Sequence, residues 1–180
     1  VLDPAYGSRY IGGESVQQTL LAMEFARRGW RVSMVCEDFG QPDGVTVNHV
    51  QVWKTYRSEE GVPVIRFLYP RLFRIWRALS RADADVYFQS CAGAMSGFVA
   101  RFCLAHGRRM IFRIAHDSDC VPGEQLISFR RDRLIYEYGL THADFVSAQS
   151  DQQRRLLEEN YSIKSDVIDM AVELDVEALT

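Results

Sequence analysis

Residues able to do acid–base or anion chemistry gather at two places in the sequence. The first is Gly12-Gly13-Glu14, a glycine-bearing loop at the start of an amphipathic stretch. Backbone N–H groups at the amino end of a helix favour anions, so this loop is a candidate phosphate site. The second is the segment from His116 to Cys120, which follows an apolar run typical of a central strand.

His116 can act as a general base if a nearby carboxylate orients its imidazole. Asp117 is adjacent in sequence, and Asp119 or Glu14 could also supply that carboxylate. Metal binding by His116, Asp119 and Cys120 is an alternative, but no second pair at ligand spacing supports it, and we expect no metal. An ordinary surface histidine is the remaining interpretation.

Helix and strand patterns place both segments in one kind of fold. Apolar residues at helical spacing predict a helix from about residue 14 to 28, closed by Gly29 and followed by a strand at 32–35. Valines alternating about Asn48-His49 predict a further strand or hairpin. From Asp85 onward strands and helices alternate, with strands expected at 85–89, 110–115, 144–148 and 166–170, and helices at 92–106, 128–140 and 150–160.

This alternation predicts an α/β fold with a doubly wound, mainly parallel sheet and helices on both faces. In such sheets ligands bind at the carboxyl ends of strands, near a topological switch point. Both candidate segments fall at such ends. Ser150 and Gln153 additionally have the spacing of a capping box for the helix that follows.

A basic helix is expected between Pro70 and about Arg81, after an extended stretch at 62–69. Pro70 stands where the first position of a helix is expected. Apolar residues from Leu72 to Leu79, Phe73 among them, would face the core. The opposite side is lined by four arginines, Arg71, Arg74, Arg77 and Arg81. A solvated face is the simpler interpretation. The alternative is an anionic substrate or an anionic membrane, which such a face would bind weakly and in a salt-sensitive way.

Composition points to one soluble globular domain. The chain has 180 residues, 47% of them hydrophobic, and a net charge of -3, which does not suggest a nucleic-acid partner. No apolar run reaches the length of a membrane span, and the four cysteines form no CxxC pair. We expect reduced cysteines and a cytoplasmic protein, with at most peripheral contact at the inner membrane face. The first residue, Val1, and the tail at 177–180 suggest a piece of a longer protein.

Common nucleotide motifs are missing from the sequence. It contains no GxxxxGK[ST], no GxGxxG and no GxSxG, which argues against a P-loop and an α/β-hydrolase. Glu37 stands where a dinucleotide-binding acid would stand, after the second strand of such a fold. A NAD-dependent oxidoreductase is therefore an alternative, as is a non-catalytic docking module.

The order of several short motifs resembles one family. These motifs are Ile11-Gly12-Gly13-Glu14-Ser15, the 20–32 helix-to-strand run, Ala84–Gln89, Ile114-Ala115-His116-Asp117, Ala143–Ser150 and Val167-Ile168. Together they resemble the N-terminal domain of the GT-B retaining glycosyltransferases, the large glycosyltransferase family 4 group. The resemblance covers nearly the whole chain.

The resemblance implies roles for both segments. The loop of Gly12, Gly13 and Glu14 would approach the phosphates of a nucleotide-sugar donor, which is a substrate, so no cofactor is implied. His116 would lie near the reacting sugar, with Asp117 and Asp119 on the side of a sugar or lipid-linked acceptor. The donor-binding C-terminal domain would be supplied in cis and is absent from these 180 residues. The family usually has Pro-Asn-Gly-Val-Asp where this chain has residues 169–173, which weakens any role for Glu173.

Overall fold

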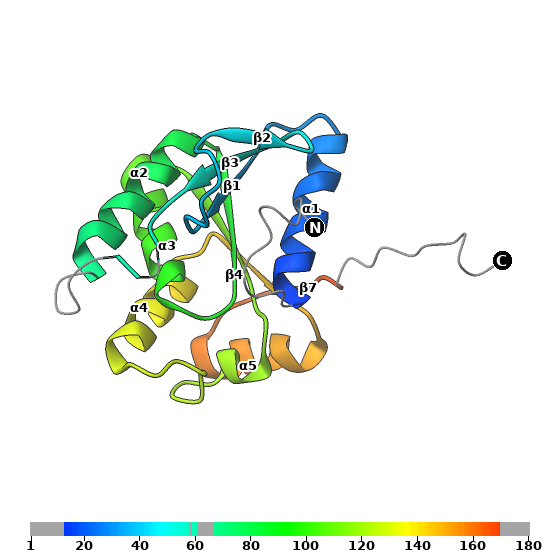
Figure 1. The fold of residues 1–180 in the computed structure, drawn as a ribbon. Coiled ribbons are helices and arrows are strands. Elements are labelled where there is room, and N and C mark those ends of the chain that lie inside the picture. Colours follow the sequence, from blue (N-terminus) through cyan, green and yellow to red (C-terminus); the bar gives the residue numbers. More distant parts are fainter. Residues whose placement is uncertain (1–12, 58, 61–66, 170–180) are drawn as a thin grey trace.

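The computed structural model describes residues 13–57, 59–60 and 67–169 (Figure 1). Its helices are α1 (Gly13–Arg27), α2 (Phe73–Ala82), α3 (Ala94–His106), α4 (Arg130–Thr141) and α5 (Asp151–Tyr161), with a π-helical stretch at Phe67–Leu72 and a 3₁₀ turn at Asp117–Cys120. Its strands are β1 (Val32–Cys36), β2 (Val45–Val47), β3 (Val50–Lys54), β4 (Val86–Ser90), β5 (Arg109–Arg113), β6 (Phe145–Ala148) and β7 (Asp166–Val167).

The first sheet has the order β1-β3-β2. β1 and β3 are parallel, and β2 and β3 form the predicted antiparallel hairpin. Asn48 and His49 turn this hairpin with φ angles of 48° and 63°, which is the left-handed backbone that tight two-residue hairpins require. His49 therefore has a local structural role.

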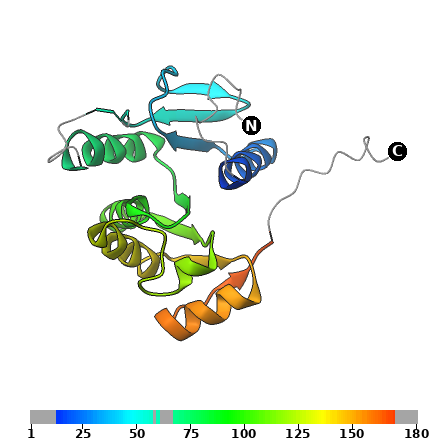
Figure 2. The same ribbon diagram turned by 60° about the horizontal axis from the view of Figure 1, so that its bottom comes forward.

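The second sheet is wholly parallel, with the order β4-β5-β6-β7. The α/β fold with a mainly parallel sheet is confirmed. Within the described residues β1 and β4 do not pair with each other. Each is an edge strand, so the strands form two separate sheets. Figure 2 shows the β1–β3 sheet with α1 and α2 on one side of the molecule, and the β4–β7 sheet with α3, α4 and α5 on the other.

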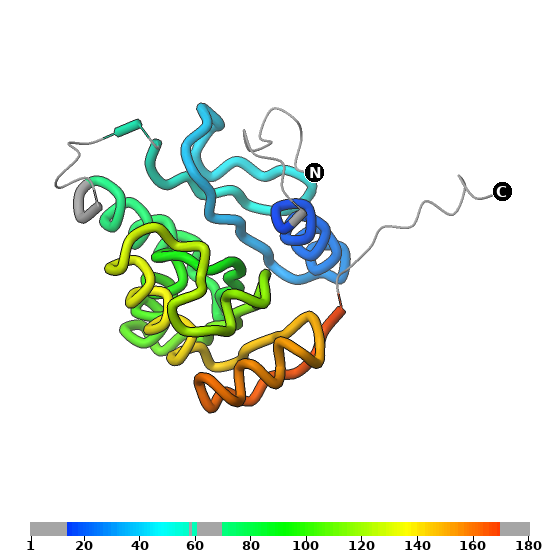
Figure 3. The backbone as a smooth tube through the Cα atoms, turned by 90° about the horizontal axis from the view of Figure 1, so that it is seen from below, coloured from blue at the N-terminus to red at the C-terminus, as the bar shows by residue number. Residues whose placement is uncertain are grey.

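Successive residues of a strand face opposite sides of the sheet, and β5 shows what covers each side. Phe112 is fully buried and its ring lies 5.8 Å from that of Tyr136 in α4. Arg113, the next residue, faces Glu14 in the first turn of α1. Helices α3 and α4 therefore cover one face, while the amino end of α1 lies over the other at its carboxyl edge. Figure 3 shows α1 and the β7 segment on the side opposite α4.

Helices α3 and α4 cross at two glycines. A Cβ at Gly97 would lie 2.3 Å from the carbonyl oxygen of Ile135, and one at Gly139 would lie 2.4 Å from the carbonyl carbon of Ser96. Only glycine permits this approach of the two backbones. The small residues at the start of α3 thus serve packing against α4.

The basic helix differs from its prediction at its start. The chain is already helical from Phe67, so residues 67–69 are not extended and Pro70 lies inside a helical stretch. Pro70 is the fourth residue of this stretch, so the N–H that it lacks belongs to the first turn, where N–H groups have no acceptor within the helix. The rest of the expected 62–69 strand lies outside the described residues. Phe73 was expected in the core but is 58% exposed, because Ile75, Ala78, Leu79 and Ala82 form the buried face of α2.

Candidate functional site

His116 lies just beyond the carboxyl end of β5, and its side chain is exposed. Its backbone is clamped by one residue. The N–H of His116 donates to Oδ2 of Asp119 at 3.0 Å, and its carbonyl oxygen accepts the N–H of Asp119 at 3.0 Å. The 3₁₀ turn that follows therefore fixes the backbone that carries the imidazole.

Asp119 is 1% exposed and belongs to the interior of this turn. Burial raises the pKa of its carboxyl group, while the backbone N–H of His116 acts in the opposite direction. The hydroxyl of Tyr136, also fully buried, donates to the carbonyl oxygen of Asp119 at 2.9 Å. Asp119 thus links the turn that carries His116 to the core beneath α4.

Asp117 is exposed and points to α5. Its Oδ1 accepts a hydrogen bond of 2.9 Å from Nε2 of Gln153, a buried residue in the first turn of α5. Ser150 caps α5 as predicted, because its hydroxyl accepts the N–H of Gln153 at 3.2 Å. In a full capping box the Gln153 side chain would accept the N–H of Ser150. Here Oε1 of Gln153 instead accepts the N–H of Gln149, at 2.8 Å. Gln153 therefore connects two neighbouring carboxyl ends of the sheet.

Part of the predicted glycine loop can be placed. Gly12 lies outside the described residues, and Gly13 is the first residue of α1. Glu14 is largely buried, and its Oε1 lies 4.0 Å from Nη1 of Arg113. The two predicted segments are thus brought to the same edge of the sheet, joined through an arginine three residues before His116.

Sequence reasoning missed Arg113, together with Ser90, Cys91 and Ser147, which flank it at the same edge. Arg113 was the single charged residue in an otherwise apolar central strand, and that was the available signal. Cys91 follows β4 with a φ of 67°, a strained value for a residue other than glycine. Burial, and next the carboxylate of Glu14, raise the pKa of its thiol to about 11.

The predicted arginine face is mostly engaged within the protein. Arg74 pairs with Glu60, and Arg81 pairs with Asp43. The guanidinium of Arg71 lies 4.9 Å from the ring centre of Tyr56, and that of Arg81 lies 4.2 Å from that of Trp53. Arg77 is exposed on the outer side of α2. No helix in the described residues has both the length and the apolar character needed to cross a bilayer.

Glu37 follows β1, at the position considered for dinucleotide binding. Burial raises the pKa of the Tyr56 hydroxyl, and the nearby carboxylate of Glu37 is the next cause. The carboxylate of Glu37 therefore interacts with Tyr56. In the described residues no group of three or more His, Cys, Asp or Glu side chains converges as a metal site would require. The expectation of no metal and no cofactor stays a prediction.

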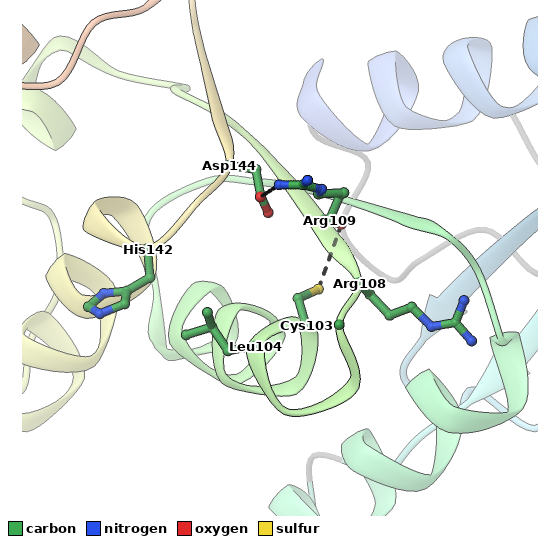
Figure 4. Close-up of a pocket in the computed structure, with 7 residues that line it drawn as sticks. Cys103, Leu104, Arg108, Arg109, His142 and Asp144 are labelled. Carbon is green, nitrogen blue, oxygen red and sulfur yellow. Dashed lines mark hydrogen bonds and ion pairs between the residues drawn. The ribbon is translucent and has the colours of Figure 1, made fainter.

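A cavity of about 310 Å³ lies at the opposite end of the strands from His116. Figure 4 shows two of its lining residues, with the side chain of Arg109, at the start of β5, pointing to Asp144, just before β6. Their side chains are 2.5 Å apart. The N–H of Met110 and then Arg109 hold the pKa of Asp144 below its usual range. Because the charges of Arg109 and Asp144 pair with each other, the carboxyl edge remains the candidate functional site.

Comparison with known families decides the class of the protein. The family model described as a glycosyl transferase 4-like domain matches residues 12–170. The chain belongs to this glycosyltransferase family. No curated protein matches it significantly. Membership in a glycosyltransferase family favours sugar transfer over the oxidoreductase and docking-module alternatives, and it agrees with a site at the carboxyl edge of a parallel sheet.

Proposed function

We propose that this domain is the acceptor-binding half of a glycosyltransferase that moves a sugar from a nucleotide-sugar to an acceptor with retention of configuration. One observation carries the proposal. The exposed imidazole of His116 stands just beyond the carboxyl end of β5, on a backbone clamped by Asp119 and three residues after Arg113, which faces Glu14 in the first turn of α1. Family membership supplies the reaction class.

The reaction breaks the bond between the anomeric carbon and a phosphate oxygen, and the nucleotide leaves with the electron pair. The acceptor hydroxyl oxygen forms the new bond to that carbon and loses its proton. His116 takes this proton if it is a base; if it only positions the hydroxyl, the proton passes to the departing phosphate. In both cases the imidazole must lie within hydrogen-bond distance of the acceptor hydroxyl. Asp117 is exposed on the acceptor side, and the buried Asp119 acts there through the backbone of His116.

The donor is held from two sides in this proposal. Gly13 and Glu14, at the amino end of α1, approach its phosphates together with Gly12, which precedes them in the sequence, because the helix dipole favours negative charge there. A second domain in cis holds the rest of the nucleotide-sugar. Catalysis requires both reactants to be positioned together, so the 180-residue domain alone should not transfer sugar. Turnover of a nucleotide-sugar by the isolated domain would contradict this division of labour.

The test of the proposal is His116→Ala in the full-length enzyme. Turnover should fall about 10²-fold or more, the usual effect of removing a positioned acid–base group. The free energy of unfolding should hardly change, because the imidazole is exposed. His142→Ala is a matched control, since His142 is also exposed but lies at the opposite end of the strands. Wild-type turnover in His116→Ala would reduce His116 to a surface residue.

A weak peripheral contact with anionic lipid is a second proposal, and a lipid-linked acceptor would suit it. Phe73 is 58% exposed, and Arg77 lies one turn further along the outer side of α2. Such a pair can bring one apolar and one cationic group to a membrane surface. Co-sedimentation with anionic vesicles at low salt should weaken in Phe73→Ser/Arg77→Gln. Equal binding of this variant, or binding to neutral vesicles, would remove the proposal.

A further inference from the structure

Three polar side chains form a row across the carboxyl edge of the second sheet. Ser90 of β4 is in register with Arg113 of β5, and Arg113 is in register with Ser147 of β6. Residues in register on neighbouring strands face the same side of a sheet. All three are at least nine-tenths buried, with Arg113 only 7% exposed. A polar row of this kind is unusual in the interior of a parallel sheet.

The first turns of α1 lie directly over this row. Nε2 of Gln18 donates to the hydroxyl of Ser90 at 2.5 Å. Glu14 faces Arg113, and α1 is a 15-residue helix, long enough for its amino end to carry an appreciable positive potential. The row and the helix end therefore face the same small volume of the protein.

Several atoms in this volume lack the hydrogen bonds that burial normally demands. Within the described part of the chain, Nη2 of Arg113, Oε1 of Glu14 and the hydroxyl of Ser147 are buried without a partner. Nearly all buried polar atoms in proteins are hydrogen-bonded, so three orphans in one place need an explanation. An unsatisfied buried charge is particularly costly.

The ion pair between Arg113 and Glu14 does not resolve this cost. Nη1 and Oε1 are 4.0 Å apart, whereas a closed guanidinium–carboxylate pair has bonds of about 2.7–2.9 Å. The guanidinium therefore keeps a donor that its neighbours in the structure do not take. Backbone strain at Cys91, at the same edge, is a further feature of sites arranged for a ligand.

We propose that Arg113, with Ser147 and the amino end of α1, binds a phosphoryl group of a substrate. A guanidinium offers only donors and matches phosphate oxygens in a fork, the hydroxyl of Ser147 can donate a third bond, and the helix end favours the negative charge. Glu14 orients the guanidinium, and its unpartnered Oε1 accepts a bond from a hydroxyl of the same ligand. This inference deepens the proposed transferase function and rests on it, because the phosphoryl group would lie beside His116.

The phosphoryl group belongs either to the diphosphate of the donor or to a phosphorylated acceptor, and two probes separate these sources. Inorganic pyrophosphate stands in for the donor, and glucose 6-phosphate stands in for a phosphorylated acceptor. Calorimetric titration of the full-length protein measures both. At least one probe should bind at millimolar concentration, and its dissociation constant should rise about tenfold or more in Arg113→Gln, the loss of one charge-assisted contact. If Arg113→Gln weakens the binding of only one probe, that probe identifies the source of the phosphoryl group.

Arg109→Gln is the matched control, because Arg109 lies on the same strand and the same face but at the amino end, paired with Asp144. It should leave both affinities unchanged. Glu14→Gln provides an independent arm should Arg113→Gln fail to fold, since removing a carboxylate 4.0 Å from the guanidinium should tighten binding of the anion. Failure of both probes to bind, equal binding by Arg113→Gln, or no tightening in Glu14→Gln would each overturn the inference.

The two proposals fail in different ways. If Arg113 governs binding of an anion but His116→Ala keeps wild-type turnover, the anion site stands without the proposed role of His116. If His116→Ala loses turnover while Arg113→Gln binds both probes normally, only the anion site is wrong.

Discussion

The buried amide of Gln153 donates to the carboxylate of Asp117 at 2.9 Å and so ties the first turn of α5 to the turn that follows β5. Both groups stand beside His116 at the carboxyl edge of the sheet. Because the same side chain also accepts the N–H of Gln149, Gln153 holds two loop ends at once. The geometry around His116 therefore depends on a helix that begins more than thirty residues later in the chain.

Replacing Gln153 by Met should release this link while nearly preserving side-chain volume. The half-buried N–H of Gln149 would lose its partner, so the free energy of unfolding should fall by about 1–3 kcal/mol. Turnover of the full-length enzyme should also fall, since Asp117 is no longer held. Urea denaturation and steady-state kinetics measure both effects. Gln152→Met, at the exposed neighbouring position, is the control and should match the wild type in each.

Replacing Asp119 by Asn should change how stability depends on pH. Burial raises the pKa of Asp119 in the folded protein, so the folded state holds its proton more tightly than the unfolded chain does. The free energy of unfolding should then decrease as pH rises from the ordinary aspartate range through the raised pKa. A pKa difference of one corresponds to about 1.4 kcal/mol.

The asparagine side chain in Asp119→Asn keeps an oxygen to accept the N–H of His116 but cannot ionise, so this decrease should be smaller in the variant. Urea denaturation between about pH 3.5 and 7.5 compares the two proteins, in a window that spans the ordinary aspartate range of about 3.9. Identical slopes would show that Asp119 has no raised pKa. Asp151→Asn, an exposed position at the start of α5, is the comparison for a simple change of charge.

The crossing of α3 and α4 should not tolerate a single added methyl group. Gly97→Ala and Gly139→Ala would each bring Cβ within 2.3–2.4 Å of backbone atoms of the other helix. The helices must separate, and we expect a loss of at least about 1–3 kcal/mol in the free energy of unfolding. Gly93→Ala is a suitable control, because nothing lies within 4 Å of its Cβ position. Thermal denaturation of the three variants separates the effect of helix packing from the effect of replacing a glycine by alanine as such.

Arg81 and Arg77 should behave differently although both belong to the same basic helix. Arg81→Gln removes an ion pair with Asp43 and a contact over Trp53, and should cost about 1 kcal/mol in the free energy of unfolding. Arg77→Gln should remain within about 0.5 kcal/mol of the wild type, as is usual for exposed positions. Chemical denaturation tests the pair. Equal losses would mean that the face acts as one charged unit.

Stability should decline in alkaline solution because of buried thiols. Burial raises the pKa of Cys36, Cys91 and Cys103 to about 11 and that of Cys120 to about 12. Unfolded thiols lose their protons first, near their ordinary pKa of about 8.5, so unfolding becomes more favourable as pH rises from there towards the folded values. Urea denaturation from about pH 7.5 to 10.5 should show this decline, and Cys36→Ala/Cys91→Ala should make it shallower.

Local structure was predictable because its causes lie within a few residues. The apolar spacing of α1 and the glycine at its end predicted the helix, and Gly29 indeed adopts a φ of 84°. Ser150 capped α5 as its sequence position indicated. The start of the basic helix was mispredicted, because the chain is already π-helical from Phe67, three residues before Pro70. Helical spacing also placed Phe73 in the core, but a different face of α2 packs against the protein and Phe73 is exposed.

The sequence by itself determined the elements, the family-like order of its motifs and the positions of His116, Asp117 and Glu14 at the ends of elements. It could not determine which distant side chains would meet there. Only the tertiary structure decided that Arg113 faces Glu14 and that Gln153 reaches Asp117. The physical reason is that helix and strand patterns depend on neighbours within a turn or a pleat, whereas contacts between elements depend on strand order and on which face each helix covers.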